Sequence, residues 1–146
     1  MDLKLHSEFP LELEGQWNDL LTQSTAHVPF LRFDYLYDWW ATRGGGEWPD
    51  DARLAILTAH EAGKLIGIAP FFITTSDEKS RLYLLGSIEI SDYLDLICRA
   101  EDLERFIREV LEFVQAVLAP REDLAEIDLY NLLDESPSVD LLKETA

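Results

Sequence analysis

The sequence predicts a single α/β (α+β) domain in which a mostly antiparallel central sheet is flanked by helices. The chain has 146 residues, which is the usual length of one domain. Segments with helical periodicity stand toward both ends, and short apolar runs separated by turn residues lie between them. An apolar content of 47% and an aromatic content of 11% are typical of a chain that forms a packed core.

Two helices are expected in the first third of the chain. Residues 13–24 carry apolar side chains at helical spacing, an arrangement that would bury Trp17. Residues 33–43 form the second expected helix, and Asp34 is a candidate cap at its start. The glycines at 44–46 end this pattern.

A β-hairpin is expected next. Residues 54–59 and 64–69 are apolar runs too short for helices, and a turn at 61–63 separates them, so they should pair as antiparallel strands. Gly67 lies inside the second strand, where a glycine indicates either a bulge or the close approach of another backbone.

Further strands are expected at 82–85, 93–98 and 126–130, and the polar stretch 75–80 is expected to be a loop. These runs are short and rich in apolar residues, as strands of a central sheet are. Together with the hairpin they predict a mostly antiparallel sheet.

The clearest helical pattern covers residues 102–118. Its apolar side chains, Val117 among them, fall on one face, and the pairs Glu101–Arg105 and Glu104–Arg108 would support the other face. Pro120 is expected to stop this helix, because proline removes a backbone donor and clashes with the preceding turn.

The charge of the chain excludes some partners. Twelve basic and 29 acidic residues give a net charge of -17, which repels nucleic acid and anionic membrane surfaces. No apolar run approaches the ~20 residues that span a bilayer, and no signal peptide is recognisable at the N-terminus, so we expect a cytoplasmic protein. The single cysteine, Cys98, lies in an apolar run and is expected to be buried and unreactive.

Few residues suggest chemistry. His6, His27 and His60 have no partner at zinc-ligand spacing, so no metal site is expected. The glycine run after Arg43 follows an expected helix, whereas phosphate-binding loops follow a strand and open a helix. No residue is assigned a catalytic role.

The strand expected at 93–98 has an unusual entry. Asp is depleted in strands, yet Asp92 and Asp95 flank Tyr93 here, and alternation places Tyr93 and Asp95 on the same face. If that face lines a cleft, Asp92, Tyr93 and Asp95 would bind an amine or hydroxyl of a substrate. The alternative is structural: Asp92 caps a turn, and Asp95 accepts hydrogen bonds from nearby backbone groups.

Several short segments together form a recognisable pattern, and with them the chain resembles the N-terminal domain of the acetyltransferases of the CelD/BcsL family, a family linked by name to cellulose biosynthesis. The resemblance extends over nearly the whole chain. The segments are Trp17, Pro29-Phe30-Leu31, Trp39-Trp40, residues 63–70, Leu85-Gly86-Ser87 and residues 91–95.

This resemblance implies a protein with two GNAT-like halves, similar in architecture to the FemAB-type peptidyl transferases. Acetyl-CoA or another acyl-CoA would then be bound mainly by the C-terminal half, and no cofactor is expected in this chain. The donor-binding turn of GNAT proteins, Arg or Gln followed by x-x-G-x-G or x-x-G-x-A, is absent, and residues 87–92 stand where it would be sought. The expected partners are the C-terminal GNAT domain and, through exposed apolar surface, a second copy of the chain.

The sequence therefore predicts that residues 1–146 form one GNAT-like domain, the substrate-side or structural half of a longer N-acyltransferase. Two alternatives remain open. The chain could be a stand-alone interaction module with the same fold, or a small independent acyltransferase. The reading frame beyond Ala146 distinguishes them, because a second domain would add roughly 150 residues.

Overall fold

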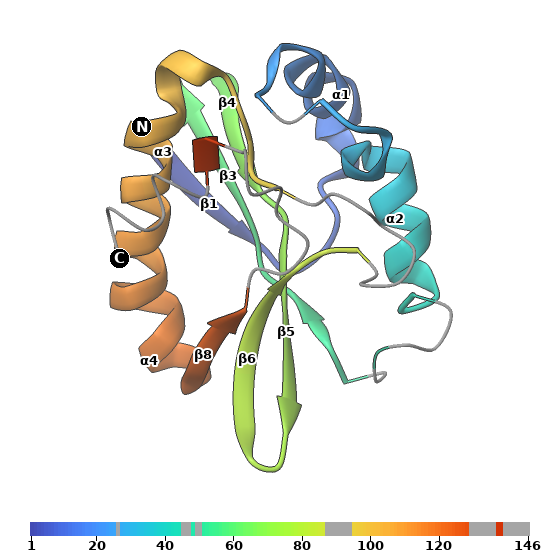
Figure 1. Cartoon of the computed structure of the whole chain (residues 1–146), viewed down its shortest axis with the longest axis vertical. Coiled ribbons are helices and arrows are strands. Elements are labelled where there is room, and N and C mark those ends of the chain that lie inside the picture. Colours follow the sequence, from blue (N-terminus) through green and yellow to red (C-terminus); the bar gives the residue numbers. More distant parts are fainter. Residues whose placement is uncertain (26, 45–47, 49–50, 87–94, 129–136, 139–146) are drawn as a thin grey trace.

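The computed structural model describes residues 1–25, 27–44, 48, 51–86, 95–128 and 137–138, and they form an α+β fold (Figure 1). The strands are β1 (Asp2–His6), β2 (Arg53–Leu54), β3 (Ile56–Glu61), β4 (Lys64–Ala69), β5 (Phe71–Ser76), β6 (Lys79–Leu84), β7 (Ile97–Cys98) and β8 (Leu124–Asp128). The helices are α1 (Glu14–Gln23), α2 (Phe33–Ala41), α3 (Ala100–Phe113) and α4 (Ala119–Glu122), with short turns η1 (Leu11–Leu13), η2 (Pro29–Leu31) and η3 (Val114–Leu118).

The strands form two four-stranded sheets, with the order β1-β3-β4-β7 in the first and β2-β5-β6-β8 in the second. We call them sheet A and sheet B. Among the described residues, the strand pairs are antiparallel except β6 with β8, which is parallel. The prediction of a mostly antiparallel sheet flanked by helices is therefore confirmed.

A single hairpin supplies strands to both sheets. Its first arm is interrupted at Ala55, between β2 and β3, and its second at Pro70, between β4 and β5. Pro70 has no N–H to donate to a neighbouring strand, so the ladder breaks at this level. Two backbone hydrogen bonds lie at the break. The Ala55 N–H donates to the Phe71 carbonyl at 3.0 Å, and the Leu85 N–H donates to the Pro70 carbonyl at 2.7 Å.

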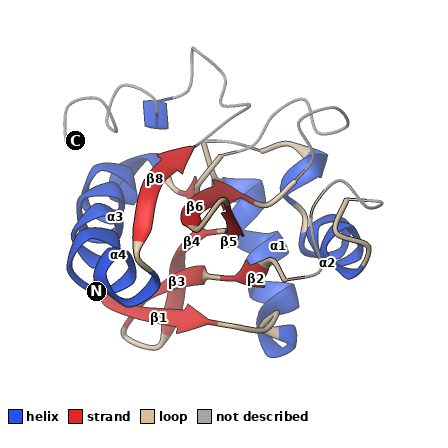
Figure 2. Cartoon of the chain, turned by 90° about the horizontal axis from the view of Figure 1, so that it is seen from below, coloured by secondary structure: helices blue, strands red, loops and turns tan. Residues whose placement is uncertain are grey.

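Helices cover the central strands from both sides. Figures 1 and 2 show α1 and α2 on one side of the strands and α3 with α4 on the other. Trp17 on α1 is fully buried, as predicted, and its indole N–H donates to the Leu31 carbonyl at 2.9 Å. None of the helices among the described residues is long and apolar enough to cross a membrane.

Gly67 in β4 is required by its neighbours. The register of β3 and β4 shifts beside it, so the expected bulge is present. A Cβ atom at this position would lie 2.7 Å from the ring of Phe106 on α3, so any side chain here would force that ring to move. The sequence indicated a bulge or the close approach of a backbone, and the close neighbour proves to be a side chain.

The start of α2 differs from the prediction. The residue at its N-cap position is Arg32, and Asp34 lies within the first turn, where its carboxylate accepts from the Arg32 Nε at 3.1 Å. The backbone N–H of Phe33 donates instead to the side chain of Asn18 on α1, at 2.9 Å. A residue from another helix therefore provides the cap. The prediction that Asp34 caps this helix was wrong.

The strands differ from the sequence prediction at three places. The stretch 75–80 is not a loop, since it contains the end of β5, the start of β6 and a tight turn at Asp77 and Glu78, both with positive φ. β1 was not predicted at all, although it pairs with β3 along its whole length. Of the strand expected at 93–98, only Ile97–Cys98 is a strand within the described residues, and residues 93 and 94 lie outside them.

Pro120 does not stop the third helix, which continues to Glu122. A wide π turn, η3, ends at Leu118, two residues before the proline, and such a turn relieves the clash between a proline ring and the carbonyl of the preceding turn. The extra residue also rotates the helix face. Val117, expected in the core, is 40% exposed, and Leu118 is buried in its place.

Candidate functional site

Of the three predicted site residues, Asp95 belongs to the part of the chain that the structure describes, where it lies two positions before β7. Asp95 is buried, with 4% of its surface exposed, and its Oδ1 accepts from the Leu96 N–H at 2.7 Å. This local contact fits the structural alternative for Asp95. Asp92 and Tyr93 lie outside the described residues, so the binding of a substrate by Asp92, Tyr93 and Asp95 stays a prediction.

The strand-to-helix turn that precedes α3 is formed by Arg99. This residue has an extended backbone, and no side chain caps the helix at this position. Glu101 and Asp102 occupy the first turn, so two carboxylates lie at the positive end of the helix dipole. They stabilise the helix, and they oppose the binding of a second anion at its exposed N–H groups.

Arg105 is held by carboxylates rather than left for a ligand. Its Nη2 lies 2.8 Å from Glu61 in the β3–β4 hairpin and 3.3 Å from Asp102. The hydrogen bond and charge of Arg105 lower the pKa of the Glu61 carboxyl. The pair expected between Arg105 and Glu101 is thus replaced by these two contacts.

Two other arginines named in the sequence analysis are also engaged. The expected pair of Arg108 with Glu104 is present at 3.0 Å. The guanidinium carbon of Arg43 lies 3.6 Å from the centre of the Trp40 ring, an arrangement in which the cation is attracted by the ring face. Its Nη1 also donates to the Trp40 carbonyl at 2.6 Å.

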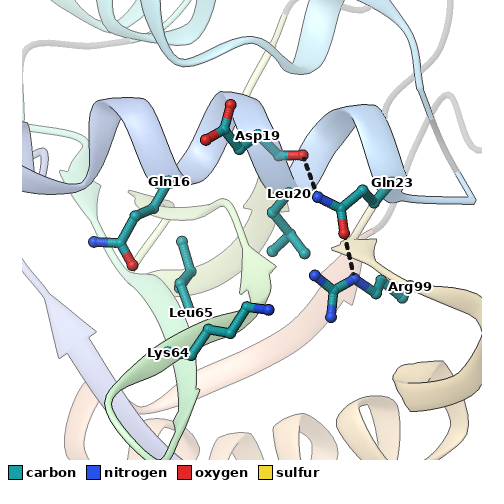
Figure 3. Close-up of a pocket in the computed structure, with 7 residues that line it drawn as sticks. All are labelled: Gln16, Asp19, Leu20, Gln23, Lys64, Leu65 and Arg99. Atoms are coloured by element: carbon teal, nitrogen blue, oxygen red, sulfur yellow. Dashed lines mark hydrogen bonds between the residues drawn. The ribbon is translucent and has the colours of Figure 1, made fainter.

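A small pocket lies between α1, the start of β4 and the start of α3 (Figure 3). Its volume is about 160 Å³. The lining side chains are two cations, two amides, two leucines and one carboxylate, namely Gln16, Asp19, Leu20, Gln23, Lys64, Leu65 and Arg99. The sequence analysis did not single out Lys64 or Arg99. Because β4 and β7 are antiparallel neighbours, the start of one and the end of the other meet at one edge of sheet A.

The histidines of β1 and β3 share one buried hydroxyl. His6 Nε2 lies 2.8 Å and His60 Nε2 lies 3.0 Å from the Oγ1 of Thr58, which is fully buried. Burial is the largest cause that lowers the pKa of each imidazole. Among the described residues, no three His, Cys, Asp or Glu side chains are grouped so that they could hold a metal ion.

Cys98 is fully buried in β7, an edge strand of sheet A. Its thiol donates to the Ile66 carbonyl at 3.3 Å, and burial raises the pKa of this thiol to about 12. A thiol with so high a pKa is almost entirely protonated at neutral pH and is a poor nucleophile. The geometry agrees with the expected structural role.

The fold is shared with solved N-acetyltransferases. The chain is similar to a ribosomal-protein-alanine N-acetyltransferase from Brucella melitensis, with 15% identity and a TM-score of 0.58 over 99% of this chain and 89% of the other. It is similar to an aminoglycoside antibiotic 6'-N-acetyltransferase from Acinetobacter haemolyticus, with 14% identity and a TM-score of 0.58 over 100% and 90%. A third similar structure is the PaiA N-acetyltransferase from Thermoplasma acidophilum in complex with coenzyme A, with 12% identity and a TM-score of 0.57 over 99% and 87%.

No protein-family model matches the sequence, and no curated protein sequence does so either. The structural similarity therefore defines the fold alone. The chain has the α+β fold of the GNAT N-acetyltransferases, and the expectation of a GNAT-like domain is confirmed at this level.

Proposed function

We propose that this domain is the substrate-side, non-catalytic half of an N-acyltransferase similar to the CelD/BcsL family. In this proposal a second GNAT-like domain binds the acyl-CoA, and the present domain covers the acceptor. Support comes from the sequence segments that resemble the family and from the GNAT fold that the chain shares with N-acetyltransferases. The first turn of α3 is the observation that carries the proposal.

Coenzyme A carries a pyrophosphate, and a helix N-terminus that follows a strand is suited to bind it through backbone N–H groups. Here that turn reads Arg99-Ala100-Glu101-Asp102, without a glycine that would let a phosphate approach the backbone. The carboxylates of Glu101 and Asp102 add local repulsion to that of a chain with net charge -17. These residues do not fit the pyrophosphate of an acyl-CoA.

The acceptor would be held on the side of this domain that faces its partner. An amine nucleophile is cationic until it is deprotonated, and carboxylates such as Asp92 and Asp95 are suited to hold it. Tyr93 would add a hydroxyl that can bond to the acceptor. This assignment retains the predicted substrate-binding residues and gives them the amine or hydroxyl of the acceptor as their ligand.

Calorimetric titration of the chain with acetyl-CoA at low salt tests the missing donor site. We expect a Kd of about 1 mM or weaker, which corresponds to roughly -4 kcal/mol, since only contacts with the pantetheine arm would remain. A variant with both Glu101→Gln and Asp102→Asn removes the repulsion but leaves the turn without glycine, so it should bind no better than millimolar. Saturable micromolar binding to the unmodified chain would contradict the proposal.

The reading frame downstream of Ala146 gives an independent test. The proposal requires about 150 further residues that contain a Q/R-x-x-G-x-G/A turn. A stop codon directly after Ala146 would contradict it and favour a stand-alone interaction module. The expected homo-oligomer of the isolated chain can be tested by light scattering at high micromolar concentration, with added salt to screen the charge.

A further inference from the structure

The pocket in Figure 3 is lined by two cations, and neither forms an ion pair with a carboxylate of the described residues. In a chain with 29 acidic residues, most described arginines are paired with carboxylates, namely Arg32, Arg53, Arg81, Arg105 and Arg108. Lys64 and Arg99 have no such partner among the residues that the structure describes, yet they line the same pocket. Their proximity therefore needs an explanation.

Arg99 is held in place by neutral groups. Its Nε donates to the Gln23 Oε1 at 2.7 Å, and the Gln23 Nε2 donates in turn to the Asp19 carbonyl at 3.4 Å. An amide partner fixes the guanidinium without cancelling its charge. Within the described part of the chain, the two terminal nitrogens of Arg99 make no hydrogen bond, so they can donate to a ligand.

Figure 3 shows how the charged groups are directed. The Lys64 ammonium and the Arg99 guanidinium point toward one another, whereas the carboxylate of Asp19 points away from the space between them. Two cations that face each other repel, and an anion placed between them replaces this repulsion with two attractions. Leu20 and Leu65 supply apolar walls on the same pocket.

The size and charge of the pocket define the ligand. A volume of about 160 Å³ holds a phosphate group, and it is well below the ~300 Å³ or more of pockets that take whole drug-sized ligands. A guanidinium fork beside an ammonium matches a doubly charged phosphate better than a singly charged carboxylate. Arg99 also lies at the positive end of α3, although Glu101 and Asp102 weaken that contribution.

We infer that this pocket is a binding site for a phosphate group, either free or at the end of a small phosphomonoester. Lys64 and Arg99 contact the phosphate, and Gln23 is a positioning residue for Arg99. The inference does not rest on the proposed function, because every lining residue belongs to this chain and the pocket is too small for coenzyme A as a whole.

Titration of the ¹⁵N-labelled full chain with inorganic phosphate at low salt, followed by NMR, tests the site. We expect saturable shifts of the Leu65 and Ala100 amides with a Kd of about 1 mM. Lys64→Gln should weaken binding about fivefold or more. The matched control is Lys79→Gln, which removes the same charge next to the β5–β6 turn and should leave the Kd within about twofold.

A second variant, Gln23→Glu, places a carboxylate beside Arg99 on the exposed surface of α1 and should abolish saturation without unfolding the chain. Parallel titrations with glycerol 3-phosphate and acetate distinguish the sources of the anion. Tighter binding of the phosphomonoester than of phosphate supports a metabolite, and equal binding supports free phosphate. Acetate that binds as well as phosphate contradicts a phosphate site.

Shifts that rise linearly with phosphate, or an equal loss of affinity in Lys64→Gln and Lys79→Gln, would overturn the inference, since both indicate only long-range attraction. The outcome is separable from the proposed function. Micromolar acetyl-CoA binding lost in Lys64→Gln would support the pocket and contradict the half-enzyme. Absence of saturation with phosphate and acetyl-CoA alike would contradict the pocket alone.

Discussion

Sheet A and sheet B share the two arms of one hairpin but are buried to different degrees. In β3 and β4 successive residues are buried, because α1 lies on one face and α3 on the other. In β6 buried residues alternate with half-exposed ones, and β8 is mostly exposed, with Ile127 at 42%. The comparison indicates that side-chain volume is tightly constrained in sheet A and weakly constrained at the β8 edge of sheet B.

The largest effect is expected from removing a large side chain from each region. Phe106→Ala, next to sheet A, deletes a fully buried ring and should lower the free energy of unfolding by about 3–5 kcal/mol. Ile127→Ala in sheet B should cost less than about 1 kcal/mol, since much of that side chain is already exposed. Urea denaturation measures the free energy of unfolding of both variants. Equal losses would show that sheet A and the β8 edge of sheet B are constrained to the same degree.

A smaller effect is expected from adding one carbon atom to sheet A. Gly67→Ala forces the Phe106 ring to move and should cost about 1–3 kcal/mol. Gly15→Ala is the matched control, because nothing lies within 4 Å of its Cβ and alanine favours the helix. The control should be neutral or stabilising by up to about 1 kcal/mol, and a tolerated Gly67→Ala would show that α3 can shift.

Acidification should act on sheet A through its histidines. The pKa values of His6 and His60 are lowered from 6.5, mainly by burial, so the unfolded chain binds protons more readily than the folded one. Glu12 and Asp2 oppose this effect, and Lys4 adds to it. The histidines therefore make stability fall as the pH drops through about 6.5.

The measurement compares the free energy of unfolding between about pH 7 and 5 in the unmodified chain and in a variant with both His6→Gln and His60→Gln. The variant should lose less stability over this range, because the carboxylates titrate in both proteins and cancel in the difference. An identical or steeper loss in the variant would show that the histidines are protonated as easily in the folded state as in the unfolded one.

The smallest perturbation is chemical labelling of the buried thiol. Cys98 has a pKa of about 12 and is fully buried in sheet A, so iodoacetamide at pH 8 should react with the native chain only through opening of the sheet. In denaturant the reaction should be complete within minutes, as for a free cysteine. Fast labelling of the native chain would mean that sheet A opens easily.

Much of the fold could be predicted because side-chain periodicity records which faces are buried. The pattern of 102–118 identified α3, and the apolar runs identified the hairpin. The segment 75–80 looked like a loop because it is polar, but Thr75 and Ser80 face each other across β5 and β6 with their hydroxyl oxygens 2.9 Å apart. Polar residues that satisfy each other in a sheet cannot be told from loop residues by composition.

The candidate site was harder to predict than the fold. Asp95 stood out because a carboxylate at a strand entry is unusual, but the sequence left open whether it binds a ligand or a nearby backbone N–H such as that of Leu96. Lys64 and Arg99 are ordinary residues at the ends of two elements, and their meeting depends on the pairing of β4 with β7. Their long-range proximity leaves no local pattern in the sequence.

The interruption at Ala55 and Pro70 has a consequence for how the molecule opens. Each arm of the hairpin runs through both sheets, so neither sheet can detach as a separate cooperative unit without pulling the same strands out of the other. Slow amide exchange should therefore be coupled across the break. The backbone hydrogen bonds Ala55–Phe71 and Leu85–Pro70 lie at the break between the two sheets. We therefore expect the two sheets to unfold together although they differ in burial.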